Sequence, residues 1–146
     1  MLKHQETVLP IFVYGTLMVG ERNYIDVLHK NLTHYEDAKV KGKLYYYKKE
    51  DYPALMKGEN WIEGQLFYVN QLHDVLKPLD QIEGYISENN PDNMYDREII
   101  ETITETGQSQ LAYVYRISPN LFQQQRHEFS LMSELSWKKF NQKRCL

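Results

Sequence analysis

A glycine-containing turn directly after a short apolar run is the first candidate for chemistry in this chain. The run Ile11–Val13 consists of β-branched and aromatic residues and predicts a short buried strand, and the sequence YGTL follows at positions 14–17. Gly15 allows backbone angles that a β-carbon would forbid, so the chain can turn sharply there. Successive backbone N–H groups in such a turn form a concave site for a carboxylate, and Thr16 adds a hydroxyl donor. The turn therefore predicts a cradle for a small anionic ligand.

This turn has two other interpretations: a nucleotide-binding P-loop, or a connection with only a structural role. Gly15 and Gly20 have the glycine spacing of a nucleotide-binding P-loop. However, Glu21 and Arg22 stand where that motif needs a lysine and a serine or threonine, so the sequence argues against nucleotide binding. The glycines could instead only shape a strand-to-helix connection, and the local pattern does not decide between that role and a cradle.

The second candidate is Glu83, which lies far along the chain in a segment with helical periodicity. Leu72, Leu76 and Leu79 recur at helical spacing and form an apolar stripe between positions 70 and 85. At about 100° per residue, Glu83 projects within roughly 20° of Leu72, so its carboxylate faces the same side as the stripe. Burying an unpaired carboxylate is costly, and such a residue is normally paired, hydrogen-bonded or functional.

The same segment leaves other interpretations of Glu83 open. Asn70 fits an N-cap and Gly84 a C-terminal stop, but Pro78 lies between them and predicts a kink or the start of a second helix. A kink would change the direction in which Glu83 projects. The side chain could then lie in solvent at the last turn, or form an ion pair with Arg97.

Taken together, these residues resemble the γ-glutamylcyclotransferase-like family, especially its γ-glutamylamine cyclotransferase branch. The segments that carry the resemblance are VYGTL at 13–17 with Gly20 and Asn23, GKLY at 42–45, YPAL at 52–55, EGQLF at 63–67, LDQIEGY at 79–85, YDR at 95–97 and AYVY at 112–115. They keep the family's order and cover roughly residues 10–117. The chain from Ser118 onward has no counterpart in this resemblance.

The resemblance implies an α+β fold, a small mixed β-barrel of about six strands flanked by short helices. It also implies that four residues hold the substrate and that Glu83 is the general acid/base; the four are Tyr14, Gly15, Thr16 and Leu17. The expected reaction releases 5-oxoproline from a γ-glutamyl amine or a small γ-glutamyl peptide. No metal and no organic cofactor is expected.

The implied reaction needs few protein groups because its nucleophile is part of the substrate. The free α-amine of a γ-glutamyl group can attack its own γ-carbonyl and close a five-membered lactam, so no serine or cysteine nucleophile is required. The enzyme must remove a proton from the ammonium, hold the chain curled and return a proton to the departing amine. One glutamate can do both transfers if apolar neighbours such as Ile82 raise its pKa towards the working pH.

A non-catalytic domain that binds a small ligand is the alternative on the same fold. Such a domain would keep the cradle and use Glu83 to hold an ammonium group. Resemblance at the level of the fold does not separate the two functions. The inward-facing carboxylate favours the enzyme.

Length and composition predict one compact domain over residues 1–146. The chain is 42% hydrophobic and carries a formal net charge of −3, which gives no electrostatic footprint for a nucleic acid. No apolar run is long enough to span a bilayer, and the first residues lack the apolar segment of a signal peptide, so a cytoplasmic protein without a membrane partner is predicted.

Other catalytic and metal-binding patterns are missing from the sequence. The five histidines show no metal-ligand spacing, and there is no Gly-x-Ser-x-Gly elbow for a hydrolase nucleophile. Cys145 is the only cysteine, and its position near the C-terminus argues against a buried nucleophile.

Periodicity and turn residues predict the elements that must position these side chains. Strands are predicted at 11–14, 33–40, 42–47, 61–69, 95–104 and 110–117, with a short helix after Asn23 and a pair of helices ending at Glu83. Thr106 and Gly107 predict a hairpin between the last two strands. A helix is predicted over 120–139, within a helical extension from 118 to 146. The polar segment 86–93 follows Glu83 directly and could reshape or cover the pocket.

Overall fold

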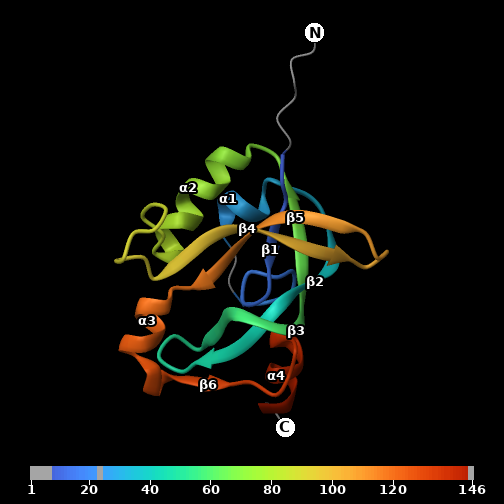
Figure 1. Ribbon diagram of the computed structural model, residues 1–146. Helices are drawn as coiled ribbons and strands as arrows, with labels where there is room; N and C mark the ends of the chain where they lie inside the picture. Colours follow the sequence, from blue (N-terminus) through green and yellow to red (C-terminus); the bar gives the residue numbers. More distant parts are fainter. Residues whose placement is uncertain (1–7, 23–24, 145–146) are drawn as a thin grey trace.

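The structure is a computed structural model of the chain, and it describes residues 8–22 and 25–144. The described elements are, in chain order, β1 (Ile11–Val13), α1 (Asp26–His29), β2 (Leu32–Tyr47), β3 (Tyr52–Val69), α2 (Leu72–Glu83), β4 (Tyr95–Thr104), β5 (Ser109–Ile117), α3 (Pro119–Gln124), the 3-10 helix η1 (Arg126–Glu128), β6 (Phe129–Leu131) and α4 (Trp137–Arg144). Figure 1 shows α1 and α2 at one end of the strands and α3, β6 and α4 at the other.

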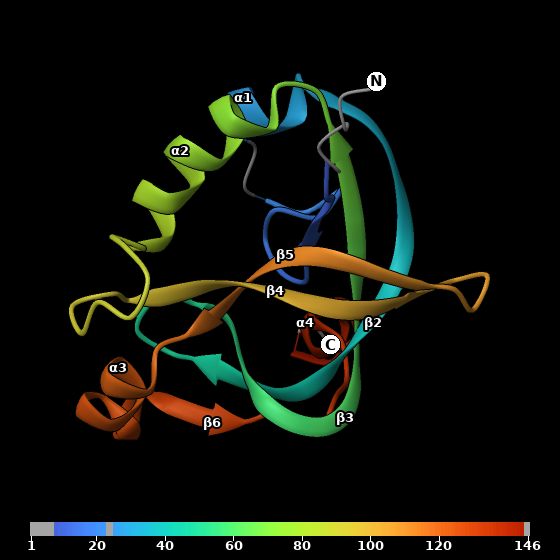
Figure 2. The same cartoon turned by 45° about the horizontal axis from the view of Figure 1, so that its top comes forward.

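Five strands close into a mixed barrel. Their spatial order is β3-β1-β5-β4-β2, and β2 pairs again with β3 to close the ring. β1 and β5 are parallel, whereas the other neighbours are antiparallel. The sixth strand, β6, pairs with the end of β2, and Figure 2 shows β2 and β3 curving together around one side of the molecule. The predicted α+β class, a small mixed barrel with short flanking helices, is confirmed.

Alternation along β2 shows how the sequence builds the barrel wall. Ala38, Val40 and Leu44 are at most 4% exposed, whereas the lysines at positions 39, 41 and 43 lie in solvent. Successive side chains of a strand point to opposite faces, so this pattern places one face of β2 in the core and the other in water. Burial of such apolar side chains stabilises the fold by about 25 cal/mol per Å² removed from water.

The two longest strands differ from the prediction. The segments 33–40 and 42–47 join into the single strand β2, with an irregular register between Gly42 and Lys43. Residues 52–60, for which the sequence predicts no strand, form the first half of β3 and pair with the end of β2. This part of β3 contains Pro53 and Gly58, both poor strand formers. Pairing across the barrel satisfies its backbone, which local propensity does not reveal.

The predicted pair of helices before Glu83 is wrong, because α2 runs without interruption past Pro78. Burial of Val75 and Leu79 on either side of the proline offsets the loss of its backbone hydrogen bond. The helix begins after Gln71, whose backbone is left-handed with a φ of 56°, and not after Asn70. The predicted stop at Gly84 (φ 70°) is confirmed, and its backbone N–H bonds back to the last turn.

A single helix over 120–139 is also wrong. The segment divides into α3, η1 and β6, and α4 begins only at Trp137. Phe129 in β6 stacks on Tyr47 with 4.3 Å between ring centroids, and the Met132 backbone N–H donates to the Leu44 carbonyl at 2.9 Å. The apolar residues that suggest a helix are therefore partly the inward face of a short strand that extends the sheet.

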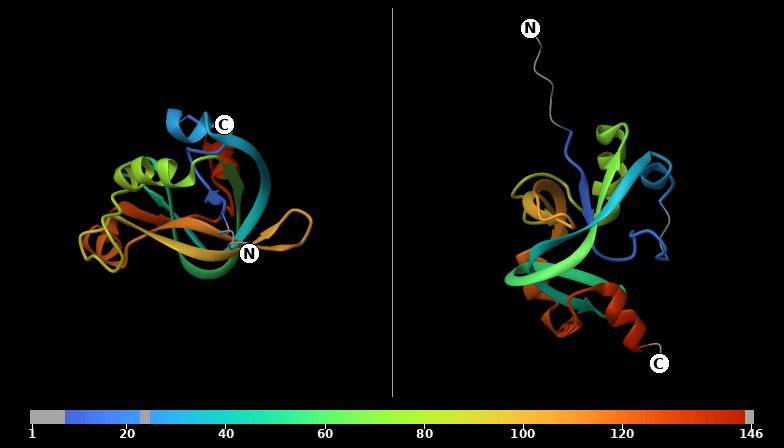
Figure 3. Two further views of the ribbon diagram at one scale, coloured as in Figure 1. Left: turned by 90° about the horizontal axis from the view of Figure 1, so that it is seen from above. Right: turned by 90° about the vertical axis from the view of Figure 1, so that its right-hand side faces the viewer.

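The predicted hairpin between the last two barrel strands is present. β4 and β5 pair over their full length, and Gly107 (φ 87°) lies in the turn that joins them. Figure 3 shows this turn projecting away from the barrel. In the part of the chain that the structure describes, no helix has both the length and the apolar character needed to cross a bilayer.

Candidate active site

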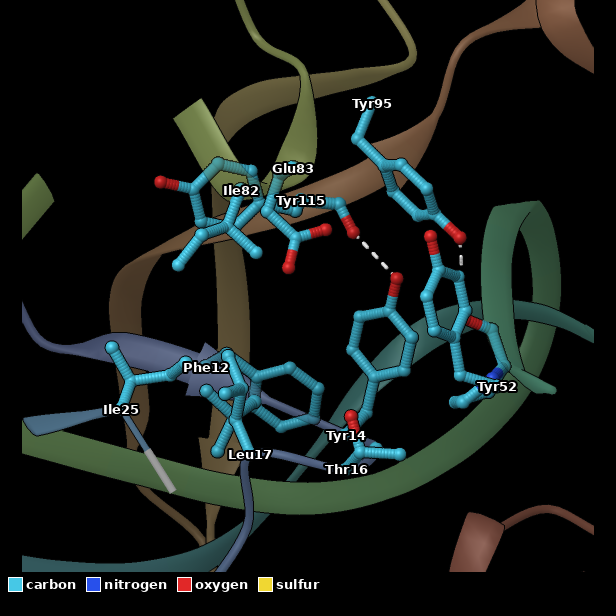
Figure 4. Close-up of a pocket in the computed structure, with 13 residues that line it drawn as sticks. Phe12, Tyr14, Thr16, Leu17, Ile25, Tyr52, Ile82, Glu83, Tyr95 and Tyr115 are labelled. Carbon is cyan, nitrogen blue, oxygen red and sulfur yellow. Dashed lines mark hydrogen bonds between the residues drawn. The ribbon is translucent and has the colours of Figure 1, made fainter. Parts of the chain in front are cut away.

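Glu83 and the loop after β1 line one cavity of about 100 Å³, although about 70 positions of sequence separate them. The wall also includes side chains from β3, β4 and β5, among them Tyr52, Tyr95 and Tyr115. Residues 14–17 form the opposite wall from Glu83, as Figure 4 shows. The fold therefore brings together all five residues that the sequence resemblance assigns to the site.

Glu83 is the last residue of α2 and directs its carboxylate into the cavity (Figure 4). The residue is half-buried, and burial raises the pKa of its carboxyl group to about 7. Among the described residues no cation forms an ion pair with it. Arg97, the alternative partner considered from sequence, instead pairs with Asp80. A carboxyl group with this pKa can accept and release a proton near neutral pH.

Gly15 is needed for close packing and not for a left-handed backbone. A β-carbon at this position would lie 2.7 Å from Cγ of Pro53, well inside van der Waals contact. The left-handed glycine of this loop is Gly20, with a φ of 88°. The Met18 backbone N–H donates to the Gly15 carbonyl at 3.1 Å and closes the turn. The sharp turn is present, but the expectation that Gly15 supplies backbone angles closed to other residues is wrong. A glycine is required there because Pro53 leaves no room for a β-carbon.

Tyr14 and His29 attach this loop to the rest of the barrel. The Tyr14 hydroxyl donates to the Tyr115 carbonyl at 2.6 Å and accepts the Leu55 backbone N–H at 3.3 Å. His29 on α1 places its Nε2 atom 3.1 Å from the Leu17 carbonyl oxygen. These contacts hold both ends of the YGTL segment against fixed elements.

Comparison with known proteins identifies the family of this chain. The pattern of the family described as "Gamma-glutamyl cyclotransferase, AIG2-like" matches residues 11–139. The chain belongs to this family. The match extends beyond residue 117 and so includes most of the segment from Ser118 onward.

Two curated relatives of this AIG2-like chain carry names that state a cyclotransferase activity. The γ-L-glutamyl-butirosin B γ-glutamyl cyclotransferase of Niallia circulans is 30% identical over 105 residues, which are 72% of this chain and 64% of that protein. The putative γ-glutamylcyclotransferase of Vibrio cholerae serotype O1 is 29% identical over 127 residues, which are 87% of this chain and 93% of that protein. The chain thus spans slightly less than two thirds of the first relative.

Solved structures show the same fold. An AIG2-like protein from Mus musculus superimposes with a TM-score of 0.59 at 23% identity, covering 77% of this chain and 78% of that one. YkqA from Bacillus subtilis gives a TM-score of 0.63 at 23% identity, covering 90% of this chain but 40% of that one.

Sequence reasoning identifies Tyr14 but not Tyr52, Tyr95 and Tyr115 of this AIG2-like site, nor the role of Asp80. The Tyr115 hydroxyl donates to Asp80 at 2.7 Å, and Arg97 donates to the other oxygen of the same carboxylate. The Arg97 guanidinium lies between two rings, 5.0 Å from the centroid of Tyr85 and 5.3 Å from that of Tyr113. These residues lie in the sequence motifs that carry the resemblance, but only the folded barrel shows that Asp80 contacts Tyr115 and Arg97.

The polar segment 86–93 lies outside the cavity wall formed by the described residues. Its last residue, Asn93, is 2% exposed and accepts the Ile86 backbone N–H at 2.6 Å. The Asn93 amide also donates to the Asp96 carboxylate at 2.9 Å. The segment therefore folds back on itself beside β4 and does not cover the site in this structure.

Two residues considered from sequence, Asn23 and Cys145, lie outside the described residues. Within the described ranges, no three histidine, cysteine, aspartate or glutamate side chains gather in a way that could hold a metal ion.

Proposed function

We propose that this protein is a γ-glutamyl cyclotransferase that releases 5-oxoproline from a γ-glutamyl amine or a small γ-glutamyl peptide. One observation carries the proposal: Glu83, whose pKa burial raises to about 7, faces the YGTL loop across a single cavity. Family membership and the names of the two relatives support it. A compact single-domain protein with a small-molecule γ-glutamyl substrate and no metal or organic cofactor is part of the same proposal.

In the proposed mechanism, Glu83 moves two protons, one after the other. Its carboxylate takes a proton from the substrate α-ammonium, and the free amine then attacks the γ-carbonyl carbon of the same glutamyl group. The carboxylic acid gives this proton to the leaving nitrogen as the bond from that nitrogen to the γ-carbon breaks. The regenerated carboxylate then takes the extra proton of the ring nitrogen and passes it to the departing amine, which leaves as an ammonium. A pKa near the working pH suits both steps, because neither protonation state is strongly disfavoured.

The loop at residues 14–17 holds the substrate in this proposal. Its backbone N–H groups bind the α-carboxylate, which places the α-amine and the γ-carbonyl close to Glu83. Thr16 lines the cavity and is 7% exposed. The mechanism gives its hydroxyl no role as a nucleophile, because the substrate supplies its own. Holding the chain curled supplies the proximity that a five-membered ring closure requires.

The test is an assay of 5-oxoproline with purified protein and a panel of γ-glutamyl amines and γ-glutamyl peptides. We expect turnover by the wild type and a fall of about 10²- to 10⁴-fold for Glu83→Gln, because the amide keeps the size of the side chain but cannot move a proton. The matched control is Glu88→Gln, at an exposed position outside the cavity, which should retain wild-type turnover. Turnover of Glu83→Gln close to that of the wild type would refute the assignment.

Binding without catalysis is the second candidate function, and the same panel separates it from the first. A binding domain would retain one of these γ-glutamyl compounds in equilibrium dialysis but release no 5-oxoproline. Its affinity would depend on the negative charge of Glu83, because the carboxylate would hold an ammonium group.

A further inference from the structure

Four tyrosines, one from the YGTL loop and one each from β3, β4 and β5, contribute to the wall of the cavity, and their hydroxyl groups differ in what they bond. They are Tyr14, Tyr52, Tyr95 and Tyr115. Tyr14 donates to a backbone carbonyl at 2.6 Å, and Tyr115 donates to the Asp80 carboxylate at 2.7 Å. Both protons are therefore committed to the protein itself.

The remaining two hydroxyls, those of Tyr52 and Tyr95, point toward one another in the same cavity that Glu83 lines (Figure 4). Burial raises the pKa of both hydroxyl groups, and the negative charge of Glu83 raises both further. The Tyr95 hydroxyl also lies 3.5 Å from the Pro53 carbonyl oxygen. Tyr95 thus directs its proton towards protein atoms.

Tyr52 is left with an O–H that has no acceptor among the described residues. Its ring is held edge-on between Tyr47 and Tyr95, with centroid separations of 5.9 and 6.0 Å. Tyr52 is the first residue of β3, and its half-buried side chain lines the cavity. The ring is therefore positioned by its neighbours, while the hydroxyl proton is available to a ligand.

The electrostatics of the site keep this hydroxyl protonated. Burial raises the pKa of Tyr52 well above its ordinary value, and the nearby Glu83 carboxylate raises it further. The cavity wall contains no arginine or lysine in the part of the chain that the structure describes. A negative charge that develops on the substrate must therefore be stabilised by neutral donors.

We propose that Tyr52 is a second catalytic residue, whose hydroxyl donates a hydrogen bond to the γ-carbonyl oxygen of the substrate as that oxygen becomes negative. This inference rests on the proposed cyclotransferase function. The backbone N–H groups of the YGTL loop hold the α-carboxylate in that function, and Tyr52 supplies a donor at the reacting carbon.

The step balances without an outside reactant. The lone pair of the substrate α-amine forms a bond to the γ-carbon, and the carbonyl π electrons move to the oxygen that Tyr52 contacts. These electrons then re-form the carbonyl while the bond from the γ-carbon to the leaving nitrogen breaks. Glu83 carries the two protons that the attacking nitrogen loses, one after the other, to the leaving nitrogen, and the products are 5-oxoproline and the amine in its ammonium form. Tyr52 keeps its own proton throughout.

Steady-state kinetics of Tyr52→Phe test this role with a γ-glutamyl substrate that the wild type converts. We expect kcat to fall by about 10²- to 10³-fold, the usual effect of removing one donor to a developing oxyanion, with KM changed by less than about threefold. Tyr95→Phe should lower kcat by a smaller factor, because the Tyr52 donor remains. Tyr68→Phe is the control, since the Tyr68 hydroxyl bonds Glu36 at 2.9 Å outside the cavity and its loss should leave kcat unchanged.

The outcomes separate this inference from the proposed function. A wild type with turnover and a Tyr52→Phe variant with the same kcat would overturn the role of Tyr52 alone. A large rise in KM at unchanged kcat would also overturn it, because the hydroxyl would then act in ground-state binding. If the wild type shows no turnover with any substrate of the panel, the proposed cyclotransferase function is refuted, and the role of Tyr52 falls with it. Thermal unfolding of Tyr52→Phe near the wild-type midpoint shows that the fold is retained.

Discussion

At the scale of single residues, the buried Glu83 carboxyl group makes the fold less stable as the pH rises. An acid in an ion pair has the opposite effect, because its pKa is lowered by folding. Burial raises the pKa of the Glu83 carboxyl group from 4.5 to about 7. Between these values the folded chain keeps a proton that the unfolded chain has lost. The free energy of unfolding should therefore fall as the pH rises from about 4.5 to about 7, at up to about 1.4 kcal/mol per pH unit.

Urea unfolding of the wild type and of Glu83→Gln, at pH 5 and at pH 8, measures this effect. We expect the glutamine variant to gain stability relative to the wild type at pH 8, because a buried charge is replaced by a neutral amide. At pH 5 the two proteins should differ less. The same difference at both pH values would show that Glu83 titrates at an ordinary pKa.

Gly15 offers a second prediction at this scale, because a β-carbon there would meet the ring of Pro53 at 2.7 Å. We expect Gly15→Ala to destabilise the fold by about 1–3 kcal/mol, the usual cost of overpacking. Pro53→Ala removes the ring atoms, so Gly15→Ala should cost less in that background. A double-mutant cycle on free energies of unfolding measures this difference. If the destabilisation by the two substitutions is additive, the contact with Pro53 is not the cause of the destabilisation by Gly15→Ala.

At the scale of elements, the end of α2 is held on the barrel by one carboxylate. Asp80 lies one helical turn before Glu83 and accepts hydrogen bonds from Tyr115 on β5 and Arg97 on β4. Tyr115 also accepts the Tyr14 hydroxyl through its backbone carbonyl. The proposed general acid/base, Glu83, and Tyr14, the first residue of the proposed substrate loop, are thus connected through Asp80 and a single strand residue, Tyr115.

We therefore expect Asp80→Asn and Tyr115→Phe each to destabilise the fold by about 1–3 kcal/mol, with non-additive effects in the double variant. A looser α2 should expose the Glu83 carboxyl group and lower its pKa towards 4.5. Carbon-13 NMR titration of labelled glutamate side chains follows this pKa without any activity assay. Asp74→Asn, on the exposed face of the same helix, is the control and should change neither quantity. An unchanged Glu83 pKa in both single variants would contradict the coupling.

At the scale of the whole molecule, the proposed chemistry depends on the barrel and on no added group. No metal-binding cluster occurs in the described ranges, and the substrate supplies its own nucleophile. We expect dialysis against a strong chelator to leave 5-oxoproline release within about twofold of the untreated protein. Activity that disappears and returns with one added metal would overturn the mechanism.

Short-range patterns in the sequence are sufficient to predict the parts of this protein that depend on neighbouring residues. A short apolar run predicts β1, strand-type segments around a hairpin turn predict β4 and β5, and Gly84 predicts the end of α2, because these features arise from backbone geometry over a few positions. The inward direction of Glu83 also follows from helical periodicity, despite Pro78. The residues of the YGTL loop and Glu83 are therefore recognisable as candidates without a structure.

Tertiary structure decided the remaining features, because they depend on pairs of residues far apart in the chain. The first half of β3 pairs with β2 and β6 extends the sheet, although local propensity favours neither strand. The bond from Tyr14 to Tyr115 joins residues 101 positions apart, and no local pattern distinguishes a tyrosine that donates to Asp80 from one that faces a substrate. Closure of the barrel fixes these distances, and with them the burial that raises the pKa of Glu83.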